Sequence, residues 1–142
     1  MAVFNDSADL ETIIGGFFER LRYVEEAHLI HQIGGSVEFI FHRPESRIRW
    51  VIQDPGVMPP FQVKIGELDV PPLLTFEQNG DTAHRFWLGT LDLQQALARQ
   101  LVRARGPLSR AMKLIPHLDT IYPVYTEHLQ AIGRQDLLAA LS

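Results

Sequence analysis

The chain has 142 residues, a net charge of −4 and no cysteine. Its length predicts a single domain over residues 1–142 with a core of its own. The lack of cysteine excludes disulfides, thiolate metal sites and cysteine nucleophiles, and the acidic balance argues against general binding to nucleic acid. The sequence contains neither a signal peptide nor an apolar run as long as a membrane span, so we expect a soluble, cytoplasmic protein.

The N-terminal segment carries the clearest helical pattern. Asp6 or Ser7 can cap a helix in which six apolar residues follow at helical spacing. They are Leu10, Ile13, Ile14, Phe17, Phe18 and Leu21. Gly15 and Gly16 fall inside this run and predict either a close helix contact or a bend. A second short helix is expected over residues 27–33, where a Gly-Gly pair follows.

The hydrophobic period changes to two after this Gly-Gly pair. Apolar and polar residues alternate over residues 37–42 and 47–53, with a Pro-Glu-Ser turn between them, which predicts a β-hairpin. Residues 61–65 and 74–76 predict a third and a fourth strand. One apolar face per strand implies an antiparallel sheet that helices cover on one side.

The segment from Asp81 to Lys113 predicts two short helices, a strand and the start of a third helix. Asp81 and Asp92 are the expected N-caps of the two helices, and Gly89 ends the first. Residues 101–105 alternate between apolar and basic side chains, as expected of a strand that joins the sheet. Beyond this segment, an apolar helical stripe begins at Ile121 and is interrupted by Pro123.

The sequence offers no motif for catalysis or for a metal. His28 and His31 are three residues apart, but neither HEXXH nor a third ligand accompanies them. A GxSxG elbow and a glycine-rich phosphate loop are also absent. We therefore expect no enzymatic activity, no metal and no cofactor.

Positive charge is concentrated in one segment. Residues 93–118 contain five basic residues and no acidic one. This segment carries +5 while the whole chain carries −4, so the remainder carries −9. The basic face can meet an anionic lipid headgroup, or it can be a solvated face on an acidic protein, which is the more common role of such a run.

Between Asp69 and Leu114 the chain contains a characteristic order of residues: Asp69-Val70, Leu74-Thr75-Phe76, Phe86, Gly89, Leu91-Asp92, Ala96, Arg103, Gly106 and Ala111-Met112-Lys113-Leu114. In this order and spacing the segment resembles the sterol carrier protein 2 family of lipid-binding domains. Gln100, where the family commonly has glycine, and the Pro71-Pro72 pair depart from its pattern.

The resemblance implies an α+β fold with a mostly antiparallel five-stranded sheet packed against helices, and an apolar tunnel between them. Such a domain binds a fatty acid, a fatty acyl derivative or a sterol-like lipid without transforming it. The predicted cavity lining is Phe86, Trp87, Leu97, Leu101, Leu108, Met112, Ile115 and Ile121. We expect Arg103 or Arg105 near a lipid headgroup or in transient contact with an anionic membrane.

Two alternatives stay open at this point. Helically spaced apolar residues can fill a core as well as line a cavity, and the pattern does not separate the two. The same fold can also serve as a protein-interaction or scaffold module of a larger lipid or isoprenoid biosynthetic assembly, with a protein partner.

Overall fold

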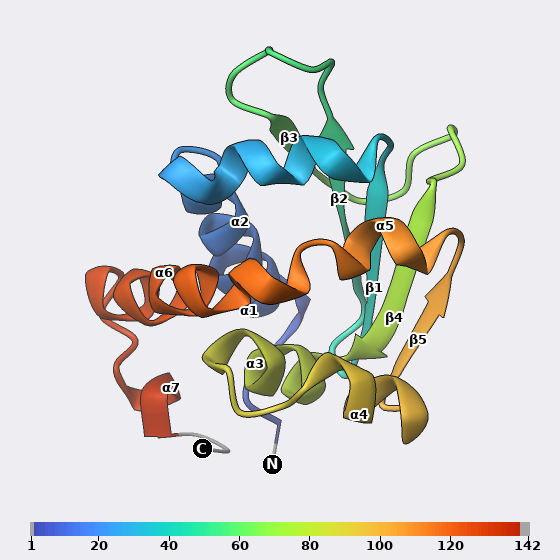
Figure 1. Cartoon of the computed structure of the whole chain (residues 1–142). Helices are drawn as coiled ribbons and strands as arrows, with labels where there is room; N and C mark the ends of the chain where they lie inside the picture. Colours follow the sequence, from blue (N-terminus) through green and yellow to red (C-terminus); the bar gives the residue numbers. More distant parts are fainter. Residues whose placement is uncertain (1, 140–142) are drawn as a thin grey trace.

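The computed structural model describes residues 2–139 and places helices against one face of a five-stranded sheet (Figure 1). The strands lie in the order β3-β2-β1-β4-β5. Their bounds are β1 Val37–His42, β2 Ser46–Ile52, β3 Phe61–Ile65, β4 Leu74–Asn79 and β5 Val102–Arg105. The predicted α+β class, the hairpin and the late fifth strand are all confirmed.

The sheet is mostly antiparallel, as the resemblance implies, but one parallel pair makes it mixed, so the purely antiparallel sheet expected from the alternation is wrong. Strands β1 and β4 are parallel, with Val37 opposite Leu74 and Phe41 opposite Gln78, whereas the other three pairs are antiparallel. Between β3 and β4 the chain crosses the face of the sheet away from the helices, where Arg49 donates a hydrogen bond to the carbonyl of Val70. Alternation along a strand reports which side chains are buried and not the direction of the neighbouring strand, so the sequence could not reveal this crossover.

Three consecutive helical segments form the N-terminal run: α1 (Ser7–Leu10), the π-helix η1 (Glu11–Gly15) and α2 (Gly16–Leu21). The six apolar residues predicted for its inner face are all buried. Asp6 is the N-cap, since its carboxylate accepts the backbone N–H of Asp9 at 2.8 Å. Gly16 marks a close contact: a Cβ there would lie 3.0 Å from the imidazole ring of His128.

The 3₁₀ helix η2 (Glu25–Ile33) follows, and α3 (Gly80–Leu88) and α4 (Leu93–Ala98) flank the end of β4. The prediction of Asp81 as N-cap of α3 is wrong, because Asn79 holds that position and the Asp81 carboxylate accepts the N–H of Val3 at 2.8 Å. Asp92 does cap α4, by accepting the N–H of Gln95 at 3.1 Å. Gly89 ends α3 with a φ of +85°, a conformation that side chains with a Cβ disfavour.

The C-terminal part contains α5 (Leu108–Met112), the 3₁₀ turn η3 (Ile115–His117), α6 (Leu118–Ala131) and α7 (Asp136–Ala139). Pro123 does not interrupt α6, contrary to the prediction. It lies on the exposed side of the second turn, where the carbonyl that loses its helical partner belongs to the exposed Asp119. Water can therefore satisfy that carbonyl, and the helix continues.

Aromatic side chains fill the centre between the sheet and the helices. The ring of Phe18 lies 5.0 Å from that of Phe39 and 5.1 Å from that of Trp50, and Phe17 lies 5.0 Å from Trp87. These edge-on and tilted contacts connect α2, α3, β1 and β2 into one core. The core fixes the two walls between which the candidate site lies.

Candidate functional site

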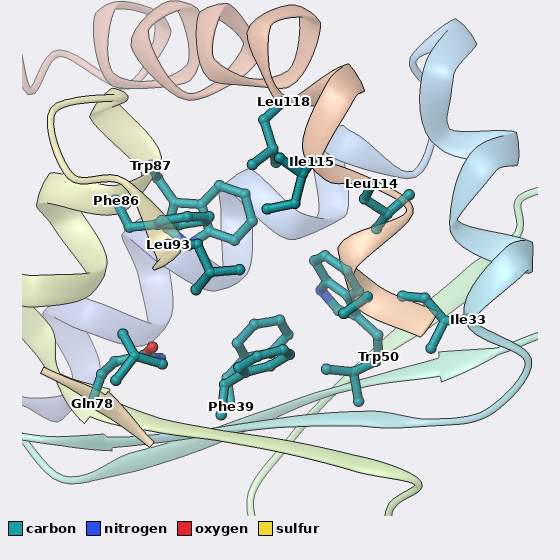
Figure 2. Close-up of a pocket in the computed structure, with 14 residues that line it drawn as sticks. Ile33, Phe39, Trp50, Gln78, Phe86, Trp87, Leu93, Leu114, Ile115 and Leu118 are labelled. Atoms are coloured by element: carbon teal, nitrogen blue, oxygen red, sulfur yellow. The ribbon is translucent and has the colours of Figure 1, made fainter. Parts of the chain in front are cut away.

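A largely apolar pocket lies between the helix-facing side of the sheet and the helices that cover it (Figure 2). Its cavity volume is about 70 Å³, and the space free of protein atoms around this cavity, open solvent included, is about 630 Å³. We call it the apolar pocket and define it by its lining: Ile33, Val37, Phe39, Trp50, Phe76, Gln78, Phe86, Trp87, Leu93, Val102, Ala111, Leu114, Ile115 and Leu118. This cavity is smaller than the roughly 300–1,000 Å³ of pockets that hold drug-sized ligands, so a long ligand has to extend into the open space beside it or displace lining side chains.

The sheet wall of the apolar pocket follows from the two-residue period of the strands. Val37 and Phe39 are two apart on β1, and Phe76 and Gln78 are two apart on β4, so each pair faces the helices. Trp50 of β2 lies opposite Val37, and its ring is 4.9 Å from that of Phe39. Four of the five strands contribute to this wall, since Val102 of β5 completes it.

The helix wall comes from several short elements. Phe86 and Trp87 of α3 contact each other edge-on at 4.8 Å and stand beside Leu93 at the start of α4 (Figure 2). Ala111, Ile115 and Leu118 belong to α5, η3 and α6. Short helices at different angles leave space that one long helix packed on the sheet would fill.

The structure brings three of the eight predicted lining residues into the apolar pocket: Phe86, Trp87 and Ile115. The other five, Leu97, Leu101, Leu108, Met112 and Ile121, do not line it. Ile121 is buried in α6, and Leu97 and Leu108 are half-buried against the core. Leu101 borders a separate pocket, because the turn before β5 directs it to the other side of Val102.

Sequence reasoning did not select the sheet residues that line the apolar pocket, foremost Phe39, Trp50 and Phe76. Their signal was available, since all three lie at apolar positions of alternating strands. Alternation, however, identifies the buried face without telling which of its residues meet a helix and which meet space.

A second pocket, more polar, opens where β4 runs into α3 and β5 begins. We call it the polar pocket; its lining is His42, Glu77, Gln78, Asn79, Thr82, Gln100, Leu101 and Arg103. Gln78 lines both pockets, so its amide marks the place where they adjoin. Sequence reasoning found Arg103 here and missed the other polar residues, which come from three separate segments.

His42 and Glu77 form an ion pair in the polar pocket, with Nε2 of His42 2.6 Å from a carboxylate oxygen of Glu77. Nδ1 of His42 lies 2.8 Å from Glu45. These two carboxylates, Glu77 first, raise the pKa of His42 above its ordinary value. The same contact lowers the pKa of Glu77, with smaller contributions from Arg105 and Arg103.

Arg103 and Arg105 have different surroundings. Arg103 of β5 lies directly opposite Glu77 of β4 in the strand register, and it lines the polar pocket. Arg105 is two residues further along β5, where its guanidinium is 3.9 Å from Glu77, and it does not line either pocket. Both arginines alternate with Val102 and Ala104 along β5, so their side chains lie on the face of the sheet away from the helices and from the apolar pocket.

Within residues 2–139, no group of three or more His, Asp or Glu side chains is arranged to hold a metal ion. Nδ1 of His28 instead lies 2.7 Å from the backbone carbonyl of Glu25, a contact within η2. No helix in this range is long and apolar enough to cross a membrane.

No protein-family model matches the chain, and no curated protein matches it. Solved structures do match. The sterol carrier protein domain 2 of Helicoverpa armigera has a TM-score of 0.54 at 22% identity, over 75% of this chain and 87% of that one. Sterol carrier protein 2 from Yarrowia lipolytica, in its apo form, has a TM-score of 0.53 at 11% identity, over 89% and 96%.

The chain has a sterol carrier protein 2-like fold. A further structure with this fold is the SCP2 domain of UbiJ, a ubiquinone synthesis protein, with a TM-score of 0.52 at 16% identity over 81% of this chain and 94% of that one. The chain also matches the sec-alkylsulfatase PisA1 at a TM-score of 0.50 and 15% identity, and there it spans only 12% of the length of the matched protein. At these identities the likeness establishes the SCP2-like fold alone.

Proposed function

We propose that this protein binds a hydrophobic small molecule, such as a fatty acid, a fatty acyl derivative or a sterol-like lipid, in the apolar pocket and does not transform it. The observation that carries the proposal is the pocket itself, whose lining is aliphatic and aromatic except for the amide of Gln78 and the indole N–H groups. The SCP2-like fold supports the same function, because its named examples include sterol carrier proteins. A continuous tunnel and a cytoplasmic location stay predictions.

Apolar burial drives such binding if the pocket widens enough to cover most of the ligand. Each buried CH₂ contributes about 0.8 kcal/mol, so a long acyl chain gains roughly 10 kcal/mol before costs. Association and ordering remove about half of that, which leaves a Kd on the order of micromolar. No polar constellation is required for this affinity, which agrees with the apolar character of the lining.

Mass spectrometry of lipid extracted from the purified native protein tests the proposal directly. We expect a co-purified hydrophobic compound at a substantial fraction of the protein concentration. A delipidated protein should also bind a fluorescent fatty acid, and Trp87→Ala should weaken that binding. Ile121→Ala is the matched control, since Ile121 is buried in α6 outside the pocket. Delipidated, folded protein that binds no displaceable fatty acid would contradict the proposal.

We further propose that Arg103 contacts the polar end of the ligand. Gln78 lines both pockets, whereas Arg103 lies on the other face of the sheet, so the polar end of a bound chain would reach the guanidinium only by passing Gln78 near the end of β4. Arg103→Ala should weaken binding of a fatty acid more than that of its methyl ester, whereas Arg105→Ala should not discriminate between them. An equal effect of the two variants would reject this role and assign both arginines to the exposed basic face.

A second function, as a protein-interaction or scaffold module, rests on exposed apolar side chains. Met58 and Val70 expose 58% and 70% of their surface, in the loops that follow β2 and β3, and Ile65 at the end of β3 is also exposed. The likeness to the UbiJ domain, named as a ubiquinone synthesis protein, supports a place in a biosynthetic assembly. A stable complex that survives in Trp87→Ala and is lost in a Met58→Ser, Val70→Ser double variant, with no co-purified lipid, would favour this function.

A further inference from the structure

One buried polar atom in the wall of the apolar pocket has no hydrogen-bond partner among the described residues: the indole Nε1 of Trp50. The Trp50 side chain is part of the sheet wall, and the residue is only 4% exposed. Figure 2 shows its nitrogen on the edge of the ring that is turned toward Phe39 and Ile115. Neighbouring atoms close off this nitrogen, so an acceptor on a bound molecule reaches it when a lining side chain moves aside.

An indole N–H can only donate a hydrogen bond. A buried donor without a partner is costly, and buried tryptophan N–H groups usually find an acceptor. Among the residues that line the pocket, Gln78 alone carries a side-chain atom that could accept. An acceptor for Trp50 has to come from what enters the pocket.

Trp50 and Gln78 lie toward opposite ends of the sheet wall. Trp50 is opposite Val37 of β1, whereas Gln78 is opposite Phe41, four residues further along that strand. Four residues of strand span roughly 13 Å. The pocket thus has two polar positions, an amide next to the polar pocket and a lone donor deep between aromatic rings.

We propose that the ligand is an oxygenated amphiphile: its polar end lies near Gln78 and its apolar part carries a further oxygen, as a ketone, hydroxyl or ether, that accepts the hydrogen bond of Trp50. Trp50 is then a specificity-determining residue, because it favours an oxygen-bearing chain over a plain hydrocarbon chain. This inference rests on the proposed lipid-binding function and specifies its ligand class.

Two probes of similar length separate the inference from the function on which it rests: stearate, and a stearate with one keto oxygen near the middle of its chain. We expect both to bind delipidated protein, the keto probe about three- to tenfold more tightly, which is the range of one net hydrogen bond. Trp50→Phe should reduce this ratio to about one, because phenylalanine keeps an aromatic ring and removes the donor. Trp87→Phe is the matched control, since it shortens the other indole of the same pocket, and it should preserve the ratio.

A measurement on the unmodified protein removes dependence on the variants. The indole N–H resonance of Trp50 can be assigned because it is absent in Trp50→Phe and persists in Trp87→Phe. Its proton chemical shift should move downfield when the keto probe binds and much less when stearate binds. If stearate and the keto probe bind equally and shift this resonance equally, the inference is overturned while the lipid-binding function stands. If neither probe binds, both are overturned.

Discussion

Replacement of Ala111 by phenylalanine tests whether the apolar pocket is hollow. Ala111 lies on α5 and lines the pocket, so a phenyl ring attached there can enter space that protein atoms do not occupy. If the ring buries about 80 Å² of additional apolar surface at about 25 cal/mol per Å², it gains roughly 2 kcal/mol. Ordering the ring costs about 0.5–1 kcal/mol, so we expect Ala111→Phe to stabilise the delipidated protein by about 1 kcal/mol.

Ala96→Phe provides the contrast, because Ala96 is fully buried on α4 and does not line the pocket. The same six carbons would there overpack a filled site and destabilise the protein by about 3 kcal/mol. Urea unfolding of both variants measures the difference through the midpoint, provided that the m-value stays constant. The two variants should differ by about 4 kcal/mol, with opposite signs.

The filled pocket should also bind ligand less well. The phenyl ring takes the place of up to about six ligand carbons, so the loss is at most roughly 5 kcal/mol at 0.8 kcal/mol for each. Because the chain can shift, we expect at least a tenfold weaker affinity for a long fatty acid, or about 1.4 kcal/mol. If Ala111→Phe destabilises the protein as much as Ala96→Phe, or leaves the affinity unchanged, the pocket is not the space in which ligand binds.

Two further predictions concern the contact between α2 and α6. Burial is the main cause that lowers the pKa of His128 below its ordinary 6.5, and the charge of nearby Arg20 is the second. Neutral His128 therefore stabilises the fold fully above pH 6.5, and this contribution is lost as the pH falls toward the lowered pKa. NMR titration of His128 and urea unfolding at several pH values, compared with His128→Gln, should show this loss only in the unmodified protein. Gly16→Ala should destabilise the protein by about 1 kcal/mol, because its Cβ would lie 3.0 Å from the imidazole ring of His128, which a hydrogen bond to the carbonyl of Ile13 holds in place. Gly15→Ala is the control: its Cβ would meet only ordinary van der Waals contacts, so this variant should be neutral or stabilising. Equal effects of the two alanines in urea unfolding would contradict this reading of the contact.

Local features of the chain were predictable because they depend on neighbouring residues. The alternation in β1 and β2, the cap at Asp92 and the positive φ of Gly89 each follow from side chains within a few positions. Asp81 shows the limit of such reasoning. Its carboxylate could accept a backbone N–H from the first turn of α3 or one from a distant segment. It accepts the N–H of Val3, which is 78 residues away in the chain.

The sequence by itself determined the strands, most helices and the supply of apolar residues, because hydrophobic period and caps are written within short windows. Only the tertiary structure decided that β4 runs parallel to β1, and that Phe39 and Trp50 face open space while Leu97 packs against the core. The physical reason is that a cavity depends on how elements far apart in the chain meet. Whether an apolar side chain borders a filled or a hollow volume is set by the atoms opposite it, and those belong to other segments.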